Sequence, residues 1–241
     1  MIDKSIKLVR DIYSGILDLI YPPFCLVCKR ADEGYLCAEC IEKMDAIEPP
    51  YCRKCGMPCE PNEFNCLDCH GREFAFDAAR SAGTFDGPLR EAIHAFKYQY
   101  HLVLADPLAE MMVRCFPNTR LAGSVDVVVP VPIHRSREIE RGFNQSVELA
   151  RRFCARLSLP LETHAIAKHR KTRHQVDLPE DQRAVNVEGA FKLLDSEPVA
   201  GKRVLLIDDV FTTGATLNEA AKVVRSAGAA SICTYTLARS L

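Results

Sequence analysis

The pattern of apolar and polar positions beyond residue 74 predicts strands and helices that alternate along the chain. Extended segments are expected at 75–85, 125–131, 162–169, 190–194, 204–207 and 231–237, and helices at 88–98, 105–115, 144–157 and 215–227. Residues 204–207 are all apolar, which is typical of a strand buried on both faces. This order predicts an α/β fold with a mostly parallel central sheet, in which ligands bind at the carboxyl ends of the strands.

The first twenty residues carry apolar side chains at helical spacing, from Ile2 and Ile6 to Leu17 and Ile20. Charged residues interrupt this pattern, so the segment is too polar for a membrane span or the core of a signal peptide. We therefore expect an amphipathic helix at 1–20 and no transmembrane segment. Its mixed charge favours docking onto the rest of the protein, and peripheral membrane association stays open as the alternative.

Composition narrows the class of protein. The chain has 241 residues and a formal net charge of -1, which predicts no bulk attraction to nucleic acid. It contains 12 cysteines, most of them between residues 25 and 69 and most in CxxC pairs. That spacing suits metal ligation better than a disulfide framework, so a reducing cytoplasm is the expected location.

Four CxxC pairs predict two tetrahedral zinc sites. The ligands are expected to be Cys25, Cys28, Cys37 and Cys40 on one ion and Cys52, Cys55, Cys66 and Cys69 on the other. A crossed pairing has the same ligand count and stays open, as does the replacement of one ligand by Cys59 or His70. Four thiolates close the coordination shell, so both ions should be structural. We expect this module to span residues 21–73 and the main domain to span 74–241.

Residues 204–216 hold the most informative motif, an apolar strand followed by two acids and a loop of small residues that opens a helix. Asp208 and Asp209 are expected to accept hydrogen bonds from ribose hydroxyls. The loop offers amides, hydroxyls and a helix N-terminus to a 5'-phosphate through Thr212, Thr213, Gly214, Ala215 and Thr216. It is no Walker A loop, because no lysine follows the glycine. The alternative is an ordinary strand, turn and capped helix.

Two basic runs in the same domain predict contacts with a diphosphate. The first follows the strand at 125–131 and contains Arg135, Arg137 and Arg141. The second covers residues 168–175, with Arg170 and Arg173, and looks like a mobile cationic flap that closes over a ligand. Lys97 is a further candidate for the same site. The alternative for each run is a solvated surface.

The motif at 204–216 resembles the signature that binds phosphoribosyl pyrophosphate (PRPP) in type I phosphoribosyltransferases. Nearly the whole chain resembles the ComF family, which joins a double zinc ribbon to such a domain. The matching motifs are the paired CxxC sequences, Cys52-Arg-Lys-Cys-Gly, Phe96-Lys-Tyr, Val129-Pro-Val-Pro, Arg141-Gly-Phe-Asn-Gln and Asp208-Asp-Val-Phe-Thr-Thr-Gly-Ala-Thr. The resemblance implies two structural zinc ions, PRPP with Mg²⁺, and a link to natural transformation, in which single-stranded DNA and other DNA-uptake proteins are the partners.

The mechanism implied by this resemblance is substitution at the anomeric carbon of PRPP, with Asp208 and Asp209 as the catalytic residues. Nothing in the sequence names the acceptor. Two other hypotheses stay open. One is a module that binds PRPP without turnover. The other is a single-stranded DNA adaptor in which Tyr51, Phe64 or Phe143 stacks on bases.

Overall fold

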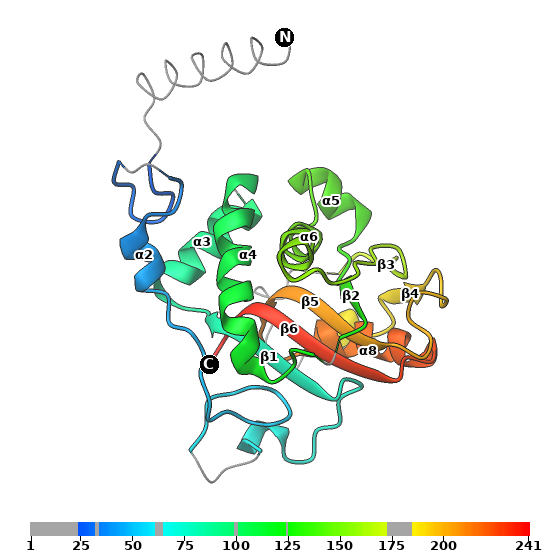
Figure 1. The fold of residues 1–241 in the computed structure, drawn as a ribbon. Helices are drawn as coiled ribbons and strands as arrows, with labels where there is room; N and C mark the ends of the chain where they lie inside the picture. Colours follow the sequence, from blue (N-terminus) through cyan, green and yellow to red (C-terminus); the bar gives the residue numbers. More distant parts are fainter. Residues whose placement is uncertain (1–23, 32–33, 61–64, 99–100, 124, 173–184) are drawn as a thin grey trace.

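The computed structural model describes residues 24–31, 34–60, 65–98, 101–123, 125–172 and 185–241 (Figure 1). The helix expected at 1–20 lies outside the described residues. So do Phe64 and the end of the predicted flap, from Arg173 onward. In the part of the chain that is described, no helix is long and apolar enough to cross a membrane.

The centre of the molecule is a four-stranded sheet in the order β1-β6-β5-β2, and every neighbouring pair in it is parallel. Its strands are β1 (Ala78–Thr84), β6 (Ser231–Arg239), β5 (Arg203–Phe211) and β2 (Val127–Pro130). This confirms the α/β fold with a mostly parallel sheet. β5 is longer than the apolar run at 204–207, because it continues through Asp208 and Asp209 to Phe211. The two acids therefore lie inside the strand. The sequence analysis had placed them after it.

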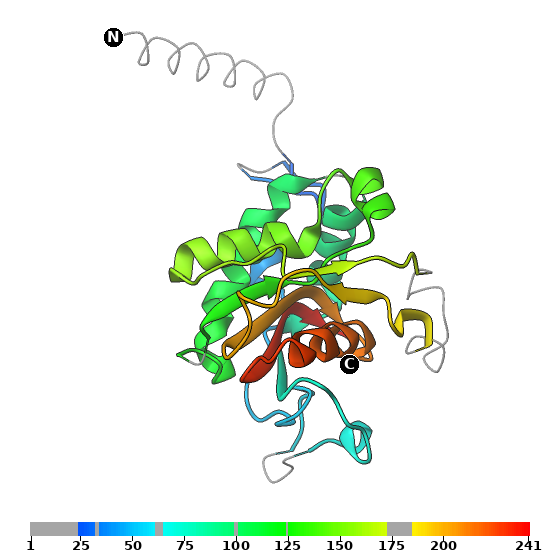
Figure 2. The ribbon, with the colours of Figure 1, turned by 90° about the vertical axis from the view of Figure 1, so that its right-hand side faces the viewer.

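Helices cover both faces of this sheet (Figure 2). One face carries α3 (Gly87–Tyr98), α4 (Ala105–Cys115) and α6 (Gln145–Leu157), and the other carries α8 (Ala215–Ser226). Side chains of β5 alternate between the two cores: Leu205 and Ile207 face the first, whereas Val204 and Leu206 face the second. That alternation explains why the run reads as continuously apolar.

The remaining elements are short. They are α2 (Ala38–Glu42), η1 (Leu67–Cys69), η2 (Leu102–Leu104), η3 (Phe116–Thr119), α5 (Arg135–Arg141) and an antiparallel pair formed by β3 (Ile166–Lys168) and β4 (Phe191–Leu193). The expected strand at 162–169 is thus shorter than predicted and belongs to a separate two-stranded sheet. α5 was not predicted, because none of its residues is buried and it has no apolar stripe.

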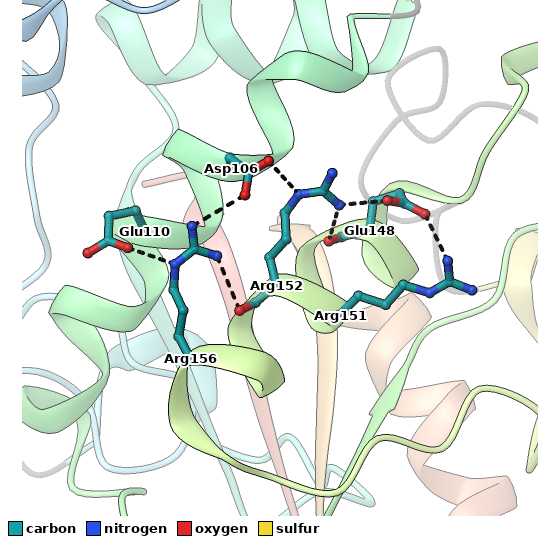
Figure 3. Close-up of polar contacts among 6 residues, drawn as sticks. All are labelled: Asp106, Glu110, Glu148, Arg151, Arg152 and Arg156. Carbon is teal, nitrogen blue, oxygen red and sulfur yellow. Dashed lines mark hydrogen bonds and ion pairs between the residues drawn. The ribbon is translucent and has the colours of Figure 1, made fainter. Parts of the chain in front are cut away.

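A charge network joins α4 to α6 (Figure 3). Arg152 pairs with Asp106 at 3.0 Å and with Glu148 at 2.6 Å, and Arg156 pairs with Glu110 at 2.9 Å and with Asp106 at 3.3 Å. These arginines are therefore matched by acids of the same two helices. The basic side chains of α6 hold the helical layer together and do not form an unmatched strip for nucleic acid.

The cysteine module divides between the two faces of the sheet. Its first half, with Cys25, Cys37 and Cys40, belongs to the core under α3, α4 and α6. Its second half, with Cys52 and Cys55, belongs to the core under α8. The backbone between and around them runs along the free edge of β1, where Ile47 donates to Ala82 at 3.0 Å, Thr84 to Asp45 at 2.9 Å and Ala79 to Lys54 at 2.7 Å. The module therefore covers a strand edge that would otherwise be open.

Candidate functional site

Two sets of four cysteines have the geometry of tetrahedral zinc sites. The sets follow sequence order: Cys25, Cys28, Cys37 and Cys40, then Cys52, Cys55, Cys66 and Cys69, and within each set the Sγ atoms lie within 4.8 Å of one another. The Sγ atoms are 3.8 Å apart in Cys25–Cys40, 3.7 Å in Cys28–Cys37, 3.8 Å in Cys52–Cys69 and 3.5 Å in Cys55–Cys66.

These distances fit zinc and exclude disulfides. A Zn–S bond of about 2.3 Å gives a tetrahedron with edges of about 3.8 Å, whereas bonded sulfurs would lie about 2.0 Å apart. Cys59 and His70 belong to neither set. Because four thiolates close the coordination shell, zinc in either set is structural.

A pocket of about 860 Å³, open to solvent, lies at the carboxyl ends of β2 and β5. It brings together many of the residues that the sequence selected: Lys97, Arg137, Arg141, Asp208, Asp209, Thr212 and Thr216. Its walls are completed by Phe85, Ile133, Lys168 and Thr172, by Val131 and Pro132, which follow β2, and by Val210 of β5. The other selected and described residues, Arg135, Arg170, Thr213, Gly214 and Ala215, do not line this pocket.

The two acids of β5 have different partners. Asp208 accepts hydrogen bonds on Oδ1 from the hydroxyl of Ser146 at 2.8 Å and from the backbone N–H of Asp209 at 2.9 Å. Asp209 forms an ion pair with Lys97, whose Nζ lies 2.8 Å from its Oδ1, and both side chains are less than one fifth exposed. Lys97 therefore belongs to the site. Ser146 was missed, because a serine in the first turn of a helix carries no signal of its own.

Burial shifts the pKa values of two titratable groups of the pocket in opposite directions. It raises the pKa of Asp208 to about 6, and the negative charge of Asp209 adds to the effect. It lowers the pKa of Lys168 to about 8, and the positive charge of Arg137 adds to that effect. Lys168 ends β3, and its Nζ lies 5.3 Å from the ring centroid of Phe191. The sequence had placed Lys168 in the flap, and the structure makes it part of the pocket wall.

The loop at 212–214 connects β5 to α8. Gly214 caps α8 with a φ of +79°, and a Cβ at this position would lie 2.6 Å from the ring of Phe211. Only glycine fits both the backbone and the space. Thr212 and Thr216 line the pocket, and Thr216 lies in the first turn of α8, so the N-terminal end of this helix adjoins the pocket and favours an anion there.

Some arginines of the two basic runs line the pocket, and others do not. Arg137 donates to the carbonyl of Thr172 at 2.6 Å, and Arg141 donates to Gln145 at 3.0 Å, both at the pocket. Arg170 donates instead to the carbonyls of Asn186 and Glu188. Arg170 therefore binds the backbone that follows residue 185 and does not line the pocket.

The parallel sheet, the acid-loop-helix motif of β5 and α8, and the two cysteine sets define a protein of phosphoribosyltransferase fold that carries a zinc module. Comparison with protein families agrees: a double zinc ribbon domain matches residues 16–70, and a phosphoribosyl transferase domain matches residues 106–241.

The chain belongs to the competence protein F family. It is 31% identical over 209 residues to competence protein F of Haemophilus influenzae, a match that covers 85% of this chain and 90% of the relative. It is 27% identical to DNA utilization protein YhgH of Escherichia coli, over 92% of this chain and 100% of the relative. Among solved structures, an allosteric regulatory enzyme of purine biosynthesis matches 55% of this chain at 22% identity with a TM-score of 0.38, and the match spans 25% of that protein.

Proposed function

We propose that the pocket at the ends of β2 and β5 binds PRPP and transfers its phosphoribosyl group to an acceptor. The observation that carries the proposal is the grouping of two carboxylates, a helix N-terminus and several cations in one pocket. A phosphorylated pentose with a diphosphate needs each of these groups. The cations match the phosphates, and the carboxylates match the ribose hydroxyls.

Each end of PRPP has residues suited to it. The 5'-phosphate accepts hydrogen bonds from Thr212, Thr216 and the amides that open α8, and the ribose hydroxyls donate to Asp208 and Asp209. The pyrophosphate is assigned to Arg137, Arg141 and Lys168, the cationic residues that line the same pocket. Magnesium fits this pocket because carboxylate oxygens are donors that it prefers, and when bound with PRPP it neutralises charge on the pyrophosphate.

The reaction is a substitution at the anomeric carbon. A bond forms between this carbon and the acceptor nucleophile, while its bond to the pyrophosphate oxygen breaks and pyrophosphate leaves with the electron pair. The sugar acquires positive charge as the bond breaks, and Asp209 stabilises that charge. Lys97, at 2.8 Å from Asp209, holds this carboxylate in place before PRPP arrives.

The family also supports a cellular setting. Relatives bear the names competence protein F and DNA utilization protein. We therefore place the proposed activity in natural transformation, in the entry of single-stranded DNA into the cytoplasm together with other DNA-uptake proteins.

The single-stranded DNA adaptor has less support. Two of the aromatic residues suggested for base stacking contact other parts of the protein. The Arg80 guanidinium lies 4.5 Å from the ring centroid of Tyr51, and the rings of Phe143 and Phe96 are 5.3 Å apart. A base would have to displace these contacts. A module that binds PRPP without turnover would use the same pocket. Experiment must therefore distinguish this hypothesis from a phosphoribosyltransferase.

The test is calorimetric titration of PRPP with Mg²⁺ into protein that has been purified without chelator, followed by measurement of pyrophosphate release with candidate acceptors. Asp209→Asn should abolish release, because the amide does not stabilise the developing positive charge. Asp195→Asn is the matched control, since Asp195 is exposed and lies outside the pocket. Binding without release from the wild type would favour the sensor, and the absence of binding at millimolar PRPP would exclude both.

A further inference from the structure

Arg239 links the second cysteine set to the end of β5. This side chain of β6 is only 3% exposed. Its Nη1 donates to the carbonyl of Cys55 at 2.7 Å, and its guanidinium lies 4.5 Å from the ring centroid of Phe211. A single buried cation therefore contacts both a zinc-binding turn and the residue that precedes the phosphate loop.

Phe211 in turn supports the loop at 212–214. Its side chain is 2% exposed, it packs edge-on against Phe76 with ring centroids 6.3 Å apart, and its carbonyl accepts a hydrogen bond from the N–H of Ser240 at 2.9 Å. Gly214 lies so close to the ring that a Cβ there would be 2.6 Å from it. A shift of the Phe211 ring therefore has to move the start of α8.

The second cysteine set is fixed to the sheet at further points. Arg80 of β1 donates to the carbonyls of Cys52 at 3.4 Å and of Arg53 at 3.0 Å. A pocket of about 610 Å³, open to solvent, is lined by Cys55 and Cys69 of this set and by Thr212 of the phosphate loop. Zinc in this set holds the turn whose carbonyl receives Arg239.

The first cysteine set has no such link. Its buried cysteines pack in the core of the opposite face, with α3 and α4. Contacts between this set and Phe211 or Arg239 are absent from the bonds and ring contacts of the described residues. The two zinc sites are thus distinguishable by what they touch.

We propose that zinc in the second cysteine set positions the phosphate loop through Arg239 and Phe211, so that loss of this ion weakens binding of the 5'-phosphate. The inference rests on the proposed function, because it assigns the loop to a phosphate. Arg239 is here a positioning residue: it acts through Phe211 and touches no ligand. Zinc bound at one face of the protein thereby sets the affinity for an anionic ligand.

The first test needs no ligand. Hydrogen exchange of the full chain, followed by mass spectrometry, is compared for wild type, Cys69→Ser and Cys28→Ser, two variants that each remove one partly buried ligand. We expect the exchange of the amides of residues 211–216 to be at least tenfold faster in Cys69→Ser than in Cys28→Ser, in which only the general loss of stability adds to the wild-type rate. Equal rates in all three proteins, or equal acceleration in both variants, would overturn the inference.

The second test measures the affinity for PRPP with Mg²⁺ by calorimetry at saturating zinc. Arg239→Met should weaken binding by roughly tenfold or more, because it removes a charged hydrogen bond while keeping an apolar stem over Phe211. Arg239→Lys should restore part of it. Arg80→Met is the control, since Arg80 holds the same turn without touching Phe211, and its affinity should stay within about twofold of wild type.

The outcomes separate the two proposals. If wild type binds PRPP and Arg239→Met binds it equally well, the coupling is wrong while the proposed function stands. If wild type binds no PRPP, the proposed function fails, and the exchange rates of residues 211–216 still decide whether zinc positions the loop.

Discussion

The charge of Asp208 has opposite effects on stability and on ligand binding: it destabilises the folded protein and is needed for the proposed binding of PRPP. Its carboxyl lies inside β5, bonded to Ser146, next to the charge of Asp209, and its pKa is raised to about 6. In the unfolded chain this carboxyl has a pKa of about 3.9. The folded protein therefore binds the proton more tightly than the unfolded chain does.

This difference gives a pH prediction with a definite sign. Above pH 6 the buried carboxylate is charged and costs the folded state up to about 3 kcal/mol, a cost that falls as the pH is lowered through 6 toward 4. We expect the contribution of Asp208 to the free energy of unfolding to rise from pH 7 to pH 5. Over the same range, affinity for PRPP with Mg²⁺ should fall, by about tenfold per pH unit below 6.

The measurement is denaturant unfolding and calorimetry at pH 5, 6 and 7 for wild type and Asp208→Asn. The amide keeps an acceptor for Ser146 but has no charge, so the variant should be more stable than wild type at pH 7 and bind PRPP poorly. Both pH dependences should be weaker in the variant. Identical pH profiles for the two proteins would show that another group titrates.

For single residues, the sequence predicts those that form the motif at 204–216. It misses the residues elsewhere in the chain that contact this motif. Asp208, Asp209 and the threonines of the loop were found because they stand in one short segment with a recognisable order. Ser146 is 62 residues away from Asp208 and is placed beside it only by the packing of α6 on β5. Whether Arg135 or Arg137 reaches the pocket depends on how α5 is rotated about its axis. The sequence does not predict this rotation, because α5 has no apolar stripe.

At the scale of elements, the turn at residues 52–56 shows how a zinc-binding segment adds to a strand. Gly56 has a φ of +74°, and a Cβ there would lie 2.6 Å from the carbonyl oxygen of Ala79 in β1. Ala79 also donates its N–H to Lys54. The backbone of this turn thus lies so close to the edge of β1 that no side chain fits at residue 56.

We expect Gly56→Ala to destabilise the protein by about 3 kcal/mol, because left-handed strain adds to a clash between two backbones. Gly71→Ala is the matched control, with a φ of +73° and nothing within 4 Å of its Cβ. It should cost only the strain, about 1 kcal/mol. Denaturant unfolding at saturating zinc gives both values, and equal losses would mean that the close approach to β1 is not maintained in solution.

The order of strands and helices in the main domain could be predicted because their apolar periods differ. α4 begins and ends at the residues that the pattern gave, Ala105 and Cys115. The β3–β4 pair was harder, because Lys168, Lys192 and neighbouring polar residues leave no regular alternation. An antiparallel pair outside the main sheet follows from tertiary contacts with α8, which the local sequence does not contain.

At the scale of the whole molecule, the cysteine module is part of both cores. Its halves contribute to the cores on opposite faces of the sheet, the first to the core that contains α3 and the second to the core that contains α8. The sequence predicts the ligands from their spacing, but it cannot show which face each half covers. The domain boundary at residue 73 stays a prediction, and the shared cores indicate that the parts on either side of it depend on each other.

Removal of zinc should therefore destabilise the whole protein. We expect a strong chelator to lower the unfolding temperature and to leave a single transition, because each cysteine set supports a core that also contains strands of the main sheet. Scanning calorimetry with and without chelator is the measurement, with zinc added back as the control. A main domain that melts at an unchanged temperature after chelation would show that the module is an independent unit.

The position of β6 also constrains the order of events during synthesis. It lies between β1 and β5, although the ribosome makes it after both. The cysteine segments emerge early, yet the strand that carries Arg239 and completes their surroundings emerges last among the four. Until then β1 has no neighbour in the sheet. Metal capture by the nascent chain should consequently precede closure of the sheet, and a stalled chain that lacks β6 should be a ready substrate for chaperones and proteases.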